Sequence, residues 1–132
     1  MAEISTAPAA GTFVWNELMT RDLAAVRPLF AELFGWSAEE MDMGPAGTYT
    51  VFKARGKSVA GCMEMSGPEW GSLPVHWMGY VCVEDADASV SKAEALGMKI
   101  CVPPTDIPNV GRFAVIEHPA TGTFSILQPT MV

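Results

Sequence analysis

An internal repeat is the feature that most limits what this chain can fold into. Residues 13–36, FVWNELMTRDLAAVRPLFAELFGW, share their order of apolar, capping and helical positions with residues 78–98, MGYVCVEDADASVSKAEALGM. A shift of 63 (85 minus 22) places Asp22 on Asp85. Repeats of this length indicate that one structural unit occurs twice.

A second pair of segments follows each of these stretches. Residues 47–52 match residues 111–116 at a shift of 64 (111 minus 47), and the same shift places Gly61 on Ser125. Order, spacing and element type all recur, so we expect residues 12–65 and 75–129 to superpose as two similar modules. The Gly- and Pro-rich residues 66–74 are the predicted linker between them.

Each module carries the signals of one strand, one helix and three further strands. Asp22 and Asp85 are good N-caps for the two helices, and Gly35 and Gly97 are suited to end them. The first module has strands at 12–19, the first half of 37–47, 48–54 and 58–65, and a helix at 23–34. The second has strands at 77–83, 99–103, 112–117 and 123–128, and a helix at 86–96. Residues 44–47 and 104–111 are a predicted turn and loop. The predicted fold class is α+β, with paired βαβββ modules in a single domain over residues 1–132.

Composition and charge exclude several classes of function. The chain has 132 residues and a net charge of −7, so it offers no basic surface for nucleic acid or an anionic membrane. No apolar run is long enough to cross a bilayer, and the first ten residues do not resemble a signal peptide. The three cysteines, Cys62, Cys82 and Cys101, form no Cys-x-x-Cys motif. We therefore expect a cytoplasmic protein with reduced thiols.

In a βαβββ unit the helix covers one face of the sheet and leaves the other bare. Two such units can shape their bare faces into a cleft, and clefts between repeats are favoured sites for small molecules. We therefore expect a small-molecule site between the modules.

The chain resembles the glyoxalase / bleomycin-resistance / extradiol-dioxygenase group, the vicinal-oxygen-chelate superfamily, from about residue 11 to 129. The segments that carry the resemblance are 15–22, 33–36, 59–61, 83–87, 95–97, 103–108, 111–113 and 122–129. The resemblance implies an incomplete, curved barrel and a homodimer. It also implies that a metal, where present, is held at the positions of Trp15, Gly61, Met78 and Ser125.

None of those four residues is a credible ligand for a divalent metal. We therefore expect no metal and no other cofactor. A displaced metal site that recruits Glu17, Glu64, His76 or Cys82 is the alternative.

Two residues are candidates for catalysis. Glu17 is a carboxylate in an apolar strand, and alternation places it on one face with Trp15 and Met19. It could act as a general base or bind a polar ligand, or it could be a structural ion-pair partner. Tyr80 is its repeat partner and could donate a hydrogen bond to a carbonyl or phenol, or be a core tyrosine.

The other candidates are predicted to contact a ligand. Trp15, Met78 and Ser125 accompany Glu17 and Tyr80 on the inner face. Trp70 in the linker is a candidate for stacking on a ligand. Arg112 could bind an anionic group or form a salt bridge. Trp36 and Trp77 are expected in the core.

The preferred function is a metal-free, glyoxalase-like protein that binds a small, largely apolar or aromatic metabolite or drug. One alternative is a lyase, isomerase or dioxygenase-type enzyme that uses Glu17 and Tyr80. Another is a partner or regulatory module without a small ligand. Fold-level resemblance does not choose between them.

Overall fold

The computed structural model describes residues 9–42, 48–65, 67–107 and 110–130. The chain divides into two compact units. The first unit comprises Asn16–Trp77, and the second comprises Met1–Trp15 with Met78–Val132. No helix among the described residues is long and apolar enough to cross a membrane.

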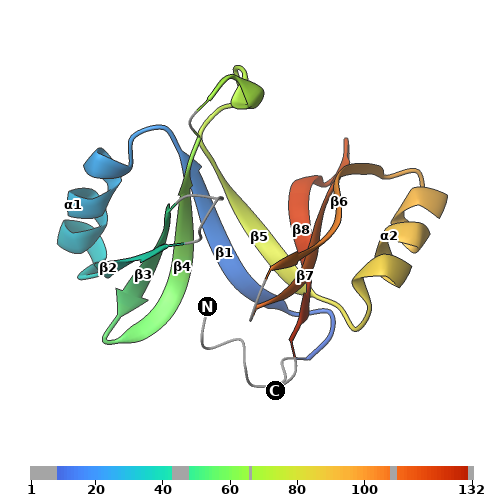
Figure 1. Cartoon of the computed structure of the whole chain (residues 1–132), viewed down its shortest axis with the longest axis horizontal. Helices are drawn as coiled ribbons and strands as arrows, with labels where there is room; N and C mark the ends of the chain where they lie inside the picture. Colours follow the sequence, from blue (N-terminus) through green and yellow to red (C-terminus); the bar gives the residue numbers. More distant parts are fainter. Residues whose placement is uncertain (1–8, 43–47, 66, 108–109, 131–132) are drawn as a thin grey trace. The chain divides into compact units, whose positions relative to one another are not determined.

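The first unit is a four-stranded sheet with one helix, in the strand order β2-β3-β4-β1. Strands β1 and β4 are parallel, and the other neighbours are antiparallel. Figure 1 shows α1 lying against one face of this sheet. The element bounds are β1 Phe13–Thr20, α1 Leu23–Phe34, β2 Ser37–Asp42, β3 Thr48–Ala54, β4 Lys57–Glu64 and the 3-10 helix η3 Pro68–Trp70.

The second unit repeats this arrangement in the strand order β5-β8-β7-β6. Strands β5 and β8 are parallel, and α2 lies against one face of the sheet (Figure 1). The element bounds are β5 His76–Cys82, α2 Ala86–Ala95, β6 Lys99–Ile107, β7 Gly111–His118 and β8 Gly122–Pro129.

Equivalent residues hold equivalent places in the two units. Glu17 pairs with Gly61 between the parallel strands of the first unit, and Tyr80 pairs with Ser125 between those of the second. The offsets are 63 (80 minus 17) and 64 (125 minus 61), as the sequence repeat requires. The predicted α+β fold of paired βαβββ modules is confirmed.

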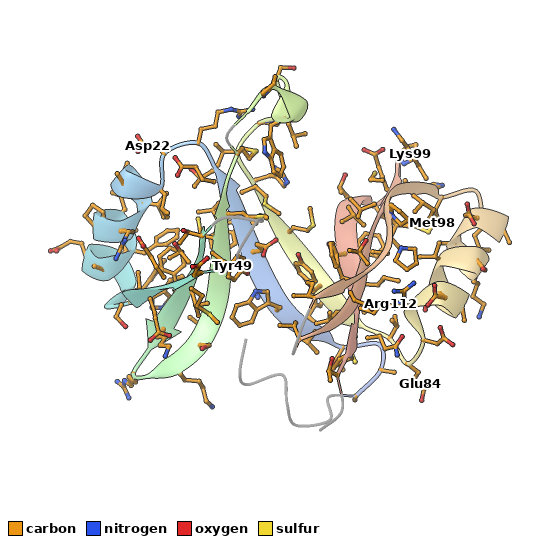
Figure 2. All side chains as sticks on the ribbon, in the orientation of Figure 1. Asp22, Tyr49, Glu84, Met98, Lys99 and Arg112 are labelled. Atoms are coloured by element: carbon orange, nitrogen blue, oxygen red, sulfur yellow. The ribbon has the colours of Figure 1, made fainter. Side chains whose placement is uncertain are left out.

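The two helices begin in the same way. The side chain of Asp22 accepts a hydrogen bond from the backbone N–H of Ala25 at 3.1 Å, and that of Asp85 accepts one from Ala88 at 3.0 Å. Figure 2 labels Asp22 at the start of α1. Gly35 ends α1 in the left-handed conformation, with φ of 71°, which glycine adopts without the steric cost of a Cβ. Both predicted N-caps are confirmed.

Each helix covers an apolar core of its own unit. Contacts of α1 with one face of the first sheet involve Leu23, Val26 and Phe30 on the helix and Leu18, Phe52, Ala60 and Cys62 on the strands. Contacts of α2 with the second sheet involve Val90 and Ala93 on the helix and Ala114, Ile116 and Ile126 on the strands. In each sheet the residues that alternate with these point to the face without a helix.

Two expectations from the sequence were wrong. Residues 104–107 are not loop, because β6 continues to Ile107. Register shifts on either side of Val102 let this edge strand carry Pro103 and Pro104, which cannot donate to a ladder. Trp36 packs against the core as predicted, but Trp77 is 48% exposed. The predicted turn at 44–47 and residues 108–109 of the predicted loop lie outside the described residues.

Candidate functional site

The helix-free face of the first sheet is apolar around its one buried carboxylate among the described residues, and it carries the charged pair Glu39 and Lys53 at its β2 edge. Leu18 packs towards α1, so Glu17 and Met19, on either side of it in β1, point the other way. Strand register continues the row from Glu17 through Gly61 to Val51. Glu17 is only 5% exposed. A carboxylate in such a setting can orient a polar group on an otherwise apolar ligand.

The neighbours of Glu17 on its sheet face are a glycine and several methionines. Gly61, its direct partner on β4, has no side chain. The next row of this face contains the pairs Met19 with Met63 and Met41 with Tyr49. Methionine side chains adapt their shape to different apolar ligands. The face therefore combines one fixed polar group with a deformable apolar surface.

The charge of Glu17 acts on Cys62, which lies on the opposite face of the sheet. Burial, followed by the negative charges of Glu17 and Glu64, raises the pKa of the Cys62 thiol to about 11. Burial, and then Glu84, also raises the pKa of Cys82. Only a thiolate is a good nucleophile or metal ligand. Both buried thiols are therefore poor candidates for either role near neutral pH.

The helix-free face of the second sheet is built around Ser125, which is fully buried. The Ser125 hydroxyl donates a hydrogen bond to Met78 Sδ at 2.7 Å, and Tyr80 is the direct neighbour of Ser125 on β5. Val115 on β7 continues the same row. The structure thus brings together Met78, Tyr80 and Ser125, three of the predicted site residues.

Trp15 and Trp70 are the two remaining aromatic residues among those predicted to contact a ligand. Trp15 is buried in the part of β1 that belongs to the second unit. Trp70 is partly exposed at the end of η3. A ligand contact for either residue stays a prediction.

Arg112 belongs to the helix-covered side of the second sheet. Its guanidinium forms a bidentate pair with Asp87 at 2.8 and 3.0 Å and a second pair with Asp106 at 3.0 Å. The hydrogen bond from Arg112 lowers the pKa of Asp87. Figure 2 places Arg112 beside α2, which carries Asp87. The salt bridge, one of the two alternatives from the sequence, is present, and the structure does not bring Arg112 to the face of Tyr80 and Ser125.

The sequence analysis missed several residues of these faces. Tyr49 and Val51 lie on the face of Glu17, and Phe113 and Val115 lie on the face of Ser125. All four alternate with residues that point towards a helix. Period-two alternation within β3 and β7 was the signal that could have identified them.

The residues at the superfamily's metal positions do not fit a divalent cation. Trp15 offers only a donor, Gly61 has no side chain, Met78 is a weak thioether ligand and Ser125 is a neutral hydroxyl. The hydrogen bond between Ser125 and Met78 already engages two of the four. Among the described residues, no group of three or more His, Cys, Asp or Glu side chains could hold a metal. We derive no chemical step through a metal.

Comparison of the sequence with known proteins finds curated relatives with glyoxylase and antibiotic-biosynthesis names, while no protein-family model matches. The chain is 40% identical over 119 residues to CFP32 of Mycobacterium tuberculosis, which is named as a glyoxylase; the match covers 90% of this chain and 44% of the relative. It is 31% identical over 129 residues to the anthracycline biosynthesis protein DnrV of Streptomyces peucetius, covering 89% of this chain and 47% of the relative. The chain thus spans about half the length of the curated relatives it matches.

Solved structures share the fold at low sequence identity. Methylmalonyl-CoA epimerase from Mycobacterium tuberculosis matches with a TM-score of 0.66 at 13% identity, over 98% of this chain and 96% of the epimerase. The Mn(II)-bound glyoxalase from Novosphingobium aromaticivorans matches with a TM-score of 0.62 at 16% identity, over 92% of this chain and 40% of the glyoxalase. Identities this low establish the fold and not the reaction.

Proposed function

Since this chain belongs to the vicinal-oxygen-chelate superfamily, we propose that it binds a small, largely apolar or aromatic metabolite or drug without a metal. The ligand would contact a helix-free sheet face, where Glu17 in the first unit or Tyr80 in the second would be the polar contact. The observation that carries the proposal is the buried carboxylate of Glu17 among the buried apolar residues of its sheet face. Apolar linings with few, well-placed polar groups are typical of small-molecule sites.

The chemistry of the two faces supports a ligand with an apolar body. Met19, Tyr49 and Val51 are buried on the face of Glu17, and Val115 and Leu127 are buried in the second sheet near Ser125. Apolar surface of the ligand itself contributes roughly 25 cal/mol per Å² when it is removed from water. A carboxylate accepts hydrogen bonds but cannot donate them, so Glu17 favours a ligand with a hydroxyl or amine group. The relatives named for anthracycline biosynthesis make a polycyclic aromatic compound a reasonable first class to test.

An enzyme of the lyase, isomerase or dioxygenase type is the second candidate. Relatives and structural neighbours with glyoxylase, glyoxalase and epimerase names favour it. In this chain Glu17 would take a proton from the substrate and Tyr80 would donate a hydrogen bond to the oxygen that gains charge. A partner or regulatory module without a small ligand is the third candidate.

A thermal-shift screen separates binding from a role as a partner module. Aromatic metabolites, polyketides and antibiotics are added to the purified chain, with divalent metals as separate additions. A ligand that binds only the native state raises the midpoint, by about 2.7 kcal/mol of stability at 100 times its Kd. The proposal predicts hits among apolar or aromatic compounds and none among metals. No hit across the library would overturn it, and turnover of a hit, seen by mass spectrometry, would favour the enzyme.

The proposal includes a homodimer in the cytoplasm. The described cysteines Cys62, Cys82 and Cys101 are free thiols, as is typical of reducing compartments. Fractionation of the native host with an antibody against the chain would test the location.

A further inference from the structure

The outer surface of α1 carries a group of exposed apolar side chains. We define the α1 patch as Leu29, Leu33 and Phe34 of α1 together with Trp77 at the start of β5; they are 57%, 68%, 57% and 48% exposed. Phe30 joins its parts, because its ring centroid lies 5.7 Å from that of Phe34 and 5.9 Å from that of Trp77. These side chains therefore form one surface within the first unit.

The first unit's own core explains only part of the α1 patch: the rings of Phe34 and Trp77 lie against Trp36 and Phe30, with centroids 5.0 and 5.9 Å apart, whereas Leu29 and Leu33 are not among the residues of that core. Leu23, Val26 and Phe30 already provide the contacts of α1 with its sheet. The two charged residues of α1 are Arg27 and Glu32, and Arg27 pairs with Glu40 at 2.9 Å. An apolar surface that extends beyond the core-facing stripe indicates a second packing partner.

The second unit provides an internal comparison. Helix α2 has the same place in the repeat, and a shift of 63 (92 minus 29) places Leu29 on Lys92. Phe34 is an extra residue without an equivalent in α2. Leu33 has an apolar counterpart, Leu96, which is 70% exposed, and Trp77 has one in Val14. The two helices hold equivalent places in the repeat, but the outer surface of α1 is more apolar than that of α2. The fold alone therefore does not require the α1 patch.

We propose that the α1 patch is the surface through which a second copy of this chain docks. An apolar surface is complementary to itself, as the isologous contact of a two-fold dimer requires. Each copy carries a net charge of −7, and a contact centred on uncharged side chains keeps carboxylates out of its middle. The α1 patch would thus be the contact surface of the homodimer, and this inference does not depend on the small-molecule ligand.

The size of the α1 patch suits the centre of such an interface. A fully covered aromatic side chain buries roughly 150–250 Å², so the two half-exposed rings together offer about that area. The two leucines bring the α1 patch to a few hundred Å². A standard interface buries about 800 Å² per partner, so the α1 patch supplies its apolar core and the polar residues around it supply the rim.

Sedimentation velocity of the full chain tests the proposal, from about 1 to 100 μM. The wild type should sediment as a dimer. Leu33→Glu should raise the dimer Kd by about 100-fold or more, because the two-fold axis places the new charge in the contact twice. Leu96→Glu, at the equivalent and equally exposed position of α2, should leave the Kd unchanged. Far-UV circular dichroism and a melt would check that both variants are folded.

A wild type that is monomeric throughout this range would overturn the proposal. A Leu33→Glu variant that remains dimeric, or equal dissociation by Leu96→Glu, would also overturn it. The ligand screen is read separately, so a monomer that still binds an aromatic compound leaves the proposed function standing.

Discussion

Replacing Glu17 by Gln separates a ligand-binding carboxylate from a structural one. Gln keeps the shape of the side chain and one acceptor oxygen but removes the charge. Glu17 lies on β1 opposite Gly61, at 5% exposure, on the face without a helix. The substitution therefore tests the charge and leaves the packing of the face nearly unchanged.

The expected size of the effect differs between the two roles. If Glu17 binds a hydroxyl or amine of the ligand, loss of the charged hydrogen bond, worth about 1.5–3 kcal/mol, should weaken binding by roughly 10- to 100-fold. The free energy of unfolding should then change by less than about 1 kcal/mol. If Glu17 instead balances a buried positive charge, its loss should destabilise the fold by about 3 kcal/mol or more.

The assay pairs urea denaturation with calorimetric titration of the strongest hit from the ligand screen. Glu64→Gln is the matched control, because Glu64 pairs with Thr20 in the same two-strand ladder but is exposed. The control should change neither quantity. Unchanged ligand affinity together with a stability loss near 3 kcal/mol would refute the binding role.

Three further predictions follow from the described contacts. Asp22→Ala and Asp85→Ala should each lower the free energy of unfolding by about 1 kcal/mol in urea titrations, because each removes an equivalent N-cap; very unequal losses would contradict the repeat. The raised pKa of Cys62 keeps its thiol neutral, so stability should be full below pH 9 and fall as pH rises towards 11, by roughly 2 kcal/mol, and Cys62→Ala should flatten this loss. Elemental analysis of dialysed protein should find far less than one equivalent of zinc, nickel, iron or manganese, and a chelator should not shift the melting midpoint; stoichiometric metal would contradict the ligand argument.

Local signals in the sequence were sufficient for the helices and the repeat. Capping by Asp22 and termination by Gly35 depend on neighbouring residues, so the predicted helix at 23–34 agrees with α1. Strand β6 was predicted too short, because Pro103 and Pro104 are local signals against a strand. Pairing with β7 and two register shifts outweigh those signals, and they depend on residues distant in sequence.

The candidate site could be predicted only in part, for a related physical reason. Strand alternation correctly placed Glu17 and Met19 on one face, since β1 has no irregularity among its described pairs with β4. The prediction that Arg112 could bind a ligand did not consider which face of β7 its side chain occupies. Its strand neighbours Ala114 and Ile116 pack towards α2, so the same alternation sends its guanidinium to Asp87 on that helix. The apolar outer surface of α1 was not predicted, because exposure depends on packing and not on spacing alone.

The repeat gives a way to separate what the fold requires from what function requires. Where both units keep the same chemistry, as at the two aspartate caps, the fold is a sufficient explanation. Where register fixes the same place but the chemistry differs, as for Glu17 and Tyr80, the fold is not sufficient. Glu17 contributes a carboxylate, which only accepts hydrogen bonds, whereas Tyr80 contributes a phenol, which can also donate one. Exchange of the two residues, Glu17→Tyr with Tyr80→Glu, should therefore keep the fold but alter which ligands bind.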